Sequence, residues 1–481
     1  MTTQSVDPRT GQSFGPLFPD SSAEDVDHVV GAASEAALEW GDLPPASRVS
    51  ALAAVADALD ARAGDLVAIA DRESGLGQPR LVGELARTTF QLRMFAAAVG
   101  AGEYSRVVDD PQVSGPPPAG HPAMRRVLVP VGPVAVFGAS NFPFAFSVPG
   151  GDTASALAAG CPVVVKAHPG HPQTSAVVAH LMATALVAAG APAGTLGIVH
   201  GLDAGRLLVV HPLVRAAAFT GSYSGGRALF DLAVGRPDPI PFYGELGSVN
   251  PVVVTPQAAA RGQVLASDYV DSLTLGSGQF CTNPGLLLVP SGSGLLEMIS
   301  AEASSRPAGV LLHDGVAQLL RINVARLAGV PGVRTMVNES RPAGAGARSG
   351  PVILAADATT AVAHPELVRT ECFGPAGVVV EYSSNEELVE VLGLLEGCLV
   401  AAVHGAESEP LAKTLVRGLA RVAGRVVWNG WPTGVAVTAG QQHGGPHPAT
   451  TSSLHTSVGT LAAFRFLRPV TYQSLPPGLM P

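Results

Sequence analysis

Cys281 is the residue whose type and setting most clearly allow chemistry. It stands in the string GQFCTNPG at 278–285, between a Gln-Phe pair and a Thr-Asn pair, with glycine and proline close by. A thiol attacks a carbonyl carbon as the thiolate, and a cysteine in a loop or at a helix end, near backbone amides, can be activated for that attack. Cys281 is therefore either a nucleophile held in a loop or one more small apolar residue in a core.

The other three cysteines are predicted to be structural. Cys161 leads a buried strand, Cys398 lies in an apolar run, and Cys372 lies inside ECFGP. Free cysteines usually behave as small apolar residues in a core. No two of the four cysteines form a CxxC pair with metal-ligand spacing, so the sequence predicts no metal site and a reduced compartment.

The elements that must position Cys281 change in character along the chain. Residues 22–100 have a helical, alanine-rich pattern, in which Leu52, Val55, Leu59 and Leu66 share one stripe. A proline-rich link follows at 109–122, and from residue 127 short β-branched runs alternate with helical runs. Apolar strands that each precede a helix predict an α/β fold with a doubly wound parallel sheet.

The glycine pattern of this first α/β unit differs from the usual nucleotide-binding fingerprint. No GxGxxG follows an early strand, and FTGSYSGG at 219–226 is the nearest equivalent. Its glycines, Gly221, Gly225 and Gly226, open a helix after a strand, where backbone amides can bind phosphate. Taken alone, this turn is weak evidence for a phosphate site.

A second α/β unit is expected after Glu245, which opens the string ELGSVNP behind an apolar strand. Alternating runs such as NPVVVTP and GLLLVP continue to about residue 445. The tail VGTLAAFRFLRPVTYQ is apolar and strand-like, and a lone terminal strand needs a partner. We expect it to pair across a subunit boundary.

Composition excludes several classes of function. The formal net charge is −9, and the 29 lysines and arginines are scattered, which predicts no nucleic-acid partner. No uninterrupted apolar run reaches the roughly 20 residues that a membrane span requires, and MTTQSVDPRT does not resemble a secretory signal. We expect a cytoplasmic protein without a membrane partner.

Six strings together resemble the aldehyde dehydrogenase superfamily over nearly the whole chain. They are SNFPF (140–144), VVKAHPGHP (164–172), FTGS (219–222), ELGSVNP (245–251), GQFCTNPG (278–285) and TECFGP (370–375), in the family's order and at roughly its spacings. FGASNFPFAFS, KAHPGHPQTS and NGWPTGV are similar to the branch that includes α-ketoglutaric semialdehyde (2,5-dioxopentanoate) dehydrogenases and a bacterial fatty aldehyde dehydrogenase.

The resemblance implies a division of the chain into three parts. Residues 1–118 and 131–246 would form a Rossmann-like cofactor domain, and 247–445 a catalytic domain. Residues 119–130 and 446–481 would form a small β element for bridging and oligomerisation. It implies a homodimer or homotetramer.

The resemblance also implies three catalytic residues. Cys281 would add to the aldehyde, and the side-chain amide of Asn141, with the backbone amide of Cys281, would hold the oxyanion. Hydride would leave for a bound nicotinamide, and Glu245 would activate the water that hydrolyses the remaining thioester. Ser248 replaces the second glycine of the family's ELGG string, which concerns local backbone flexibility and not the base.

The cofactor residues are also carried over by resemblance. Lys166 matches the lysine that bonds the adenosine ribose. Gly221 and Ser222 match the turn beside the pyrophosphate, and Gly225 of the same glycine-rich turn is predicted to bind the cofactor with them. Glu371 matches the acid that holds the nicotinamide ribose, and Phe373 matches the aromatic residue beside it. Enzymes of the family that prefer NAD commonly place a glutamate three residues after that lysine, where this chain has Pro169. With that carboxylate missing, and with His168, His171 or Arg206 available to assist, we expect NADP to be accepted at least as well as NAD.

The substrate side depends on a helix that contains GELARTTFQLRMFA. Arg87 and Gln91 lie one turn apart on one face, and Arg87 could meet a substrate carboxylate or be an ordinary surface arginine. Phe142, Phe146 and Trp431 would form an apolar wall. We expect an NAD(P)-dependent aldehyde dehydrogenase acting on α-ketoglutaric semialdehyde. A medium- or long-chain aliphatic aldehyde, or a non-catalytic protein that keeps the fold, are the alternatives.

Overall fold

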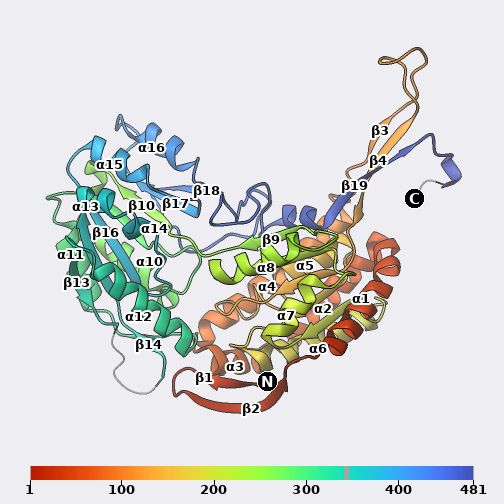
Figure 1. Ribbon diagram of the computed structural model, residues 1–481, viewed down its shortest axis with the longest axis horizontal. Helices are drawn as coiled ribbons and strands as arrows, with labels where there is room; N and C mark the ends of the chain where they lie inside the picture. Colours follow the sequence, from red (N-terminus) through yellow and green to blue (C-terminus); the bar gives the residue numbers. More distant parts are fainter. Residues whose placement is uncertain (1, 341–345, 480–481) are drawn as a thin grey trace.

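The computed structural model describes residues 2–340 and 346–479, and it has two α/β lobes from which a narrow β arm projects (Figure 1). A short hairpin, β1 (Thr2–Asp7) and β2 (Gln12–Pro19), begins the chain and lies against the first lobe. Among the described residues, no helix is long and apolar enough to cross a membrane.

The first lobe is built on a five-stranded parallel sheet in the order β7-β6-β5-β8-β9. Its strands are β5 (Val134–Phe137), β6 (Val163–Lys166), β7 (Leu196–Val199), β8 (Ala216–Thr220) and β9 (Phe242–Glu245). Its helices are α1 (Ala23–Asp42), α2 (Pro45–Ala61), α3 (Ala63–Ser74), α4 (Gln78–Gly100), α5 (Gly151–Ala159), α6 (Pro172–Ala188), α7 (Leu202–Val210) and α8 (Tyr223–Val234). The doubly wound parallel sheet predicted from the sequence is confirmed.

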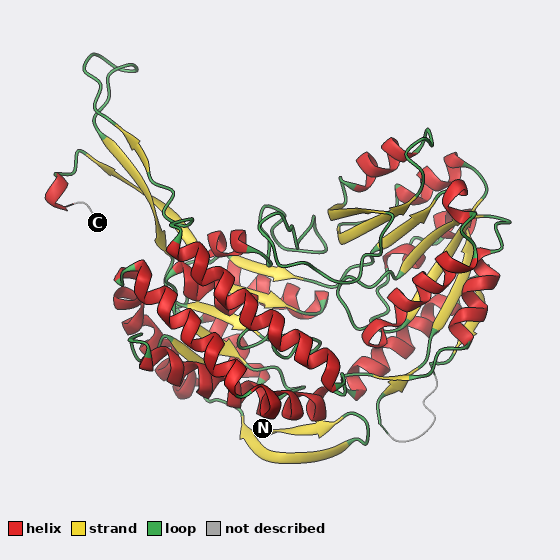
Figure 2. Ribbon diagram, turned by 180° about the vertical axis from the view of Figure 1, so that it is seen from behind, coloured by secondary structure: helices red, strands yellow, loops and turns green. Residues whose placement is uncertain are grey.

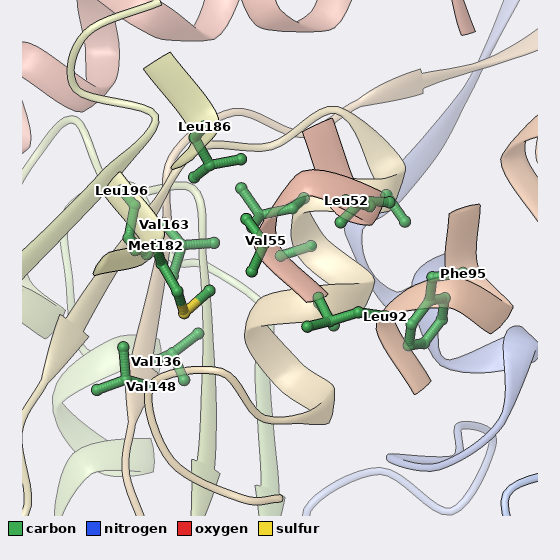
Figure 3. Packing of buried hydrophobic residues seen from close by; sticks show 14 of the residues in the cluster. Leu52, Val55, Leu92, Phe95, Val136, Val148, Val163, Met182, Leu186 and Leu196 are labelled. Atoms are coloured by element: carbon green, nitrogen blue, oxygen red, sulfur yellow. The ribbon is translucent and has the colours of Figure 1, made fainter. Parts of the chain in front are cut away.

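Helices cover both faces of this sheet, because the odd-numbered and the even-numbered residues of each strand, which point to opposite faces, are both apolar. Val134 and Val136 of β5 join a cluster with α2, α4, α5 and α6, whereas Ala135 and Phe137 join a cluster with α1 and α7. Figure 3 shows Leu52 of α2 packed in the first of these clusters. The predicted stripe is buried, but it spans two helices, since α2 ends at Ala61 and places Leu66 on α3.

The second lobe contains a seven-stranded sheet in the order β13-β15-β16-β11-β10-β17-β18, in which only β13 runs antiparallel to its neighbour. The strands are β10 (Pro251–Val254), β11 (Leu286–Pro290), β13 (Arg334–Asn338), β15 (Val352–Asp357), β16 (Ala376–Tyr382), β17 (Cys398–His404) and β18 (Ala423–Trp428). Helices α9 (Pro256–Ala259), α10 (Gln263–Thr274) and α11 (Leu295–Ser304) pack on one face. The opposite face carries α12 (Asp314–Ala328), α13 (Ala358–Ala363), α14 (Glu366–Arg369), α15 (Asn385–Leu392) and α16 (Ala412–Leu419). A minor pair, β12 (Gly309–Val310) and β14 (Arg348–Ser349), completes this lobe.

The arm is a three-stranded antiparallel sheet in the order β19-β4-β3 that points away from both lobes (Figure 2). Its strands are β3 (Val108–Asp110), β4 (Met124–Pro130) and β19 (Leu467–Gln473), so it begins before the expected boundary at residue 119. The terminal strand pairs with β4 of its own chain, and its other edge has no strand partner among the described residues, so pairing across a subunit boundary stays a prediction.

Only the second half of the apolar tail is a strand. Residues Thr460–Phe466 form the 3-10 helix η2, because Ala462, Ala463 and Phe466 are buried in the core of the first lobe. The buried guanidinium of Arg465 donates to Asp152 of α5 at 2.8 Å. The tail is therefore anchored to the first lobe before it enters the arm.

Candidate active site

Cys281 lies in the loop that follows α10 and the 3-10 turn η1 (Leu275–Gly278), and three buried amide side chains fix this loop. Asn250 Nδ2 donates to the Cys281 carbonyl at 2.8 Å, and Gln279 Oε1 accepts from the Leu312 amide at 2.8 Å. Asn283 Nδ2 donates to the carbonyls of Gly278 and Gly374, both at 2.9 Å. The polar residues around the cysteine are thus the scaffold that holds it.

The Cys281 thiol faces two ionisable side chains. Its Sγ lies 3.7 Å from His443 Nε2, and a hydrogen bond joins it to Glu245. Burial and the charge of Glu245 hold the pKa of Cys281 well above its usual value. The thiolate must therefore form at the moment of reaction, with a neighbouring group taking the proton.

Glu245 is the last residue of β9, and its carboxylate is 5% exposed. Oε1 lies 2.8 Å from His443 Nε2, and Oε2 accepts from Ser457 Oγ at 2.5 Å. Burial raises the pKa of Glu245, but His443 and the hydrogen bonds from Ser457 and Cys281 outweigh burial and lower it overall. The carboxylate is accordingly charged, within reach of the thiol and fixed in orientation.

His443 and Ser457 are functional candidates that the sequence did not reveal. They lie in the strings QQHGG and HTSVG, which match no motif, and His443 is 162 residues from Cys281. Their backbones bond to each other, with the Ser457 amide donating to the His443 carbonyl at 2.9 Å. The segment between the second lobe and η2 thus carries side chains into the centre.

Asn141 follows β5 and is buried beside the cysteine loop. Its Nδ2 donates to the carbonyl of Gln279 at 3.1 Å, and its own carbonyl accepts from Arg80 at 2.7 Å. An amide nitrogen carries two hydrogens, so one remains available to a ligand. Asn141 and Cys281 line the same cavity, as the resemblance implied.

That cavity has a volume of about 550 Å³ and runs along the carboxyl ends of the strands of the first lobe. All eight residues that the resemblance assigned to the cofactor line it: Lys166, His168, Pro169, Gly221, Ser222, Gly225, Glu371 and Phe373. Arg206 lines it as well, whereas His171 is buried behind His168, their rings stacked at 5.5 Å. In open parallel sheets, this edge is where nucleotides bind.

The cavity has a phosphate-binding end and an acidic end. Ser222 caps α8 by accepting from the Gly225 amide, so the positive end of the helix dipole opens onto the cavity. Burial lowers the pKa of Lys166 to about 8 and raises the pKa of Glu371 to about 7. A dinucleotide with an anionic pyrophosphate and ribose hydroxyls would fit these groups.

Arg87 and Gln91 lie on α4, as predicted, and among the described residues the buried atoms Arg87 Nη1 and Gln91 Oε1 have no hydrogen-bond partner. Arg87 stacks over the Phe146 ring at 5.3 Å, and burial lowers its pKa although the charge of Glu84, and to a smaller extent Cys281 and Glu245, opposes this. Phe142 and Phe146 meet at 5.3 Å, and Phe280 adds a third ring. Trp431 instead packs against Tyr269 and His404 of the second lobe.

A buried charge pair beside these residues also escaped the sequence analysis. Glu84 Oε1 accepts from the amides of Phe144 and Ala145, at 2.8 and 3.0 Å, and so holds the segment after Asn141. Arg80 stacks over Phe142 and Phe280 at 5.0 and 4.7 Å. Both lie on α4 with Arg87, where the helical spacing of Glu84 was the available signal.

Fold and site together define a class of protein. A cysteine with a carboxylate and an oxyanion-binding amide lies at one end of a dinucleotide-sized cavity, which describes an oxidoreductase that forms a covalent thiol adduct.

Comparison with known proteins gives the family. The aldehyde dehydrogenase family model matches residues 1–453, and the chain belongs to that family. It is 44% identical over 488 residues to α-ketoglutaric semialdehyde dehydrogenase 2 of Azospirillum brasilense, covering 100% of this chain and 93% of that protein. It is 39% identical to α-ketoglutaric semialdehyde dehydrogenase of Acinetobacter baylyi, covering 100% and 92%. Aldehyde dehydrogenase C of Pseudomonas syringae, solved as a mutant with NAD+ and octanal, has a TM-score of 0.82 at 19% identity and coverages of 99% and 94%. The chain is thus an NAD(P)-dependent aldehyde dehydrogenase.

Proposed function

We propose that this enzyme oxidises α-ketoglutaric semialdehyde to 2-oxoglutarate. The observation that carries the proposal is Arg87, a partly buried cation whose charge is attracted chiefly by the buried Glu84 but whose Nη1 has no hydrogen-bond partner among the described residues. The carboxylate of an acidic aldehyde would accept a hydrogen bond from this Nη1. Two relatives of at least 39% identity over the whole chain carry the name of this activity.

The reaction begins with Cys281. Its Sγ adds to the aldehyde carbon, and the thiol proton passes to the His443–Glu245 pair, whose Nε2 and Oε1 atoms lie 2.8 Å apart. Such a pair accepts a proton without leaving an isolated buried charge. Asn141 Nδ2 and the Cys281 backbone amide stabilise the oxyanion that forms on the former carbonyl oxygen.

The second half of the reaction depends on Glu245. A bound nicotinamide supplies the hydride acceptor, for which Glu371 and Phe373 line the near end of the cavity and Lys166 the far end. The His443–Glu245 pair first releases the thiol proton to solvent. Glu245 then takes a proton from the water that attacks the thioester, and the Ser457 hydroxyl orients its carboxylate. The carboxylic acid leaves, and Glu245 returns its proton to the departing Cys281 thiolate, which restores the thiol.

A medium-chain aliphatic aldehyde is the second candidate, because Phe142, Phe146 and Phe280 form an aromatic cluster beside Arg87. Aromatic rings would pack against an alkyl chain, whereas an alkyl chain offers Arg87 no carboxylate with which to form a hydrogen bond. The choice between the two substrates therefore depends on whether the cation or the rings contribute more to transition-state binding.

The deciding experiment is a panel of dioxopentanoate, succinic semialdehyde and hexanal, with the reduced cofactor followed by absorbance. We expect kcat/KM to be largest for dioxopentanoate and turnover to vanish in Cys281→Ala, with cofactor binding and folding kept. A larger kcat/KM for hexanal would favour the aliphatic alternative. Full turnover in Cys281→Ala would overturn the nucleophile, and no turnover with any aldehyde would favour a non-catalytic protein.

The assembly and compartment belong to the same proposal. We expect a homodimer or homotetramer, because β19 has a strand partner on one side only within the described residues and lies on a projecting arm. The division into cofactor, catalytic and bridging domains stays a prediction, which the two lobes and an arm that starts at β3 support. All four cysteines are free thiols, which is compatible with the cytoplasm.

A further inference from the structure

The catalytic centre holds three side chains that can bind a metal ion. Cys281 Sγ, His443 Nε2 and one oxygen of Glu245 all lie within 4.8 Å of one another. The imidazole nitrogen is 2.8 Å from Glu245 Oε1 and 3.7 Å from Cys281 Sγ. We propose that these three residues form a reversible binding site for a thiophilic divalent cation, Zn²⁺ or Co²⁺, and that its occupation switches the enzyme off.

The distances are close to those of a tetrahedral site. Zinc binds thiolate sulfur at about 2.3 Å and imidazole nitrogen or carboxylate oxygen at about 2.0 to 2.2 Å, which places tetrahedral donor atoms ~3.3 to 3.7 Å apart. The nitrogen–sulfur distance of 3.7 Å already fits, whereas the nitrogen–oxygen distance of 2.8 Å must open by about half an ångström, and the sulfur–oxygen distance, which is within 4.8 Å, must come into the same range. Side-chain rotation alone can supply movements of this size.

The donor set selects the metal and balances its charge. Sulfur and imidazole donors disfavour Mg²⁺ and Ca²⁺, which prefer oxygen, and favour Zn²⁺ and Co²⁺. One thiolate, one carboxylate and one neutral imidazole carry a charge of −2, so a divalent ion makes the buried site neutral. Binding releases the Cys281 thiol proton to solvent, and His443 binds as the neutral tautomer that has its proton on Nδ1, so that the Nε2 lone pair, which now faces Glu245, is free for the ion.

Neighbouring residues fix the metal-binding side chains in place, and the large cavity gives an ion access to them. Ser457 Oγ holds the second oxygen of Glu245 at 2.5 Å, and the His443 amide donates to Thr456 Oγ1 at 2.9 Å, so two donors are fixed from the side away from the cavity. Cys281 and Glu245 line the large cavity, through which an ion can arrive. Three protein donors leave a fourth position for water, as in zinc sites that exchange ligands.

Occupation would block both halves of the reaction. A metal-bound thiolate no longer adds to the aldehyde, and a metal-bound Glu245 no longer accepts a proton from water. The inference concerns an ion that inhibits the enzyme. It is independent of which aldehyde is the substrate.

The test is cobalt titration of the reduced, untagged full-length protein, without aldehyde or cofactor. We expect one Co²⁺ per chain, a thiolate-to-cobalt charge-transfer band in the near ultraviolet, and the strong visible bands of four-coordinate cobalt. Zn²⁺ should displace the colour. In a parallel assay with an aldehyde that the enzyme accepts, Zn²⁺ should inhibit, and a chelator should restore the activity.

Matched variants separate this site from other thiols and imidazoles. Cys281→Ala should remove the charge-transfer band, with Cys281→Ser as the second variant if it fails to fold. His443→Gln and Glu245→Gln should weaken cobalt binding at least about tenfold, since losing even an outer partner of a ligand costs about 10- to 100-fold. Cys372→Ala and His455→Gln, outside the cluster, should bind as the wild type does. No thiolate band in the wild type, or an unchanged band in Cys281→Ala, would overturn the site, and unchanged affinity in His443→Gln would overturn the ligand set.

Discussion

Arg87→Met removes one buried charge from the substrate side of the active site and keeps the side-chain stem. The stem lies over the Phe146 ring, with the guanidinium carbon 5.3 Å from the ring centroid, and methionine can occupy much of that space. Burial lowers the pKa of Arg87, and its Nη1 has no partner among the described residues. Arg87 is also one of the charges that lower the pKa of the buried Glu84, but Arg80 and the amides of Phe144 and Ala145 still act on that carboxylate, so we expect only a small fall in the melting temperature.

An acidic substrate should lose far more. A charge-assisted hydrogen bond between a guanidinium and a carboxylate contributes roughly 1.5 to 3 kcal/mol, which corresponds to about 10- to 150-fold in kcat/KM. The loss of kcat/KM should occur with dioxopentanoate only, because hexanal has no carboxylate to pair with Arg87. The ratio of the two kcat/KM values should therefore drop by that factor in Arg87→Met.

The assay needs one control on the same helix. Arg93 lies about two turns further along α4, is 44% exposed, and pairs with Asp57 and Asp60 at 2.6 and 2.8 Å. Arg93→Met removes an equal charge outside the site and should leave the ratio unchanged. Equal losses for both aldehydes in Arg87→Met, or the same drop in Arg93→Met, would refute carboxylate recognition by Arg87.

Three further outcomes follow from the site. Glu245→Gln should allow one burst of reduced cofactor and then stall at the thioester, because His443 still faces the thiol and can accept its proton. If no burst occurs and mass spectrometry detects no acyl-enzyme, Glu245 itself takes the thiol proton. Pro169→Glu should shift cofactor preference toward NAD by one like-charge contact, roughly 1 to 3 kcal/mol or about five- to hundredfold. An unchanged ratio of specificity constants, or a wild type that strongly prefers NAD, would contradict this account of the 2′-site. Lys166, whose pKa burial lowers to about 8, is charged below that pH, so the preference for NADP should fall as the pH rises through 8, measured as the ratio of the two dissociation constants. A ratio that does not change with pH would exclude Lys166 as the phosphate partner.

The fold and the cofactor cavity were predictable from sequence because both depend on short-range patterns. Apolar strands followed by helices fix the parallel sheets, and the residues after each strand meet at one edge. Lys166 lies at such a strand end, that of β6, and Gly221 lies in the turn after β8. The roles of Lys166 and Cys281 were predicted from the resemblance of the strings around them to a family, because local polarity alone does not mark a nucleophile: Gln279 and Thr282 beside Cys281 are buried.

The residues missed by the sequence analysis depend on long-range packing. His443 reaches the active site only because residues 434–457 return from the second lobe to the first, and no local sequence pattern predicts that path. The prediction of a strand over the whole C-terminal tail was wrong for the same reason. Its apolar residues suggested a strand throughout, but Ala462, Ala463 and Phe466 fill a core beside α5 and take a 3-10 conformation.

The path of this returning segment explains how a centre divided between two lobes keeps its geometry. Glu245 belongs to the first lobe and Cys281 to the second, so any rotation between the lobes would change the distance between carboxylate and thiol. The segment binds Glu245 through Ser457 and through a backbone bond from Leu246 to Ala449 at 2.7 Å.

The same segment also contacts the cysteine loop. The Gly434 amide donates to Thr282 Oγ1 at 3.2 Å, next to the cysteine, and η2 fastens the far end of the segment through the buried pair of Arg465 and Asp152. Breaking such a pair by removing one partner costs about 3 to 5 kcal/mol, so this anchor is not easily released. The returning segment thus contacts both Glu245 and the loop of Cys281, and it is anchored at its end. We therefore expect this segment, more than either sheet, to set the distance between the proposed nucleophile and the proposed base.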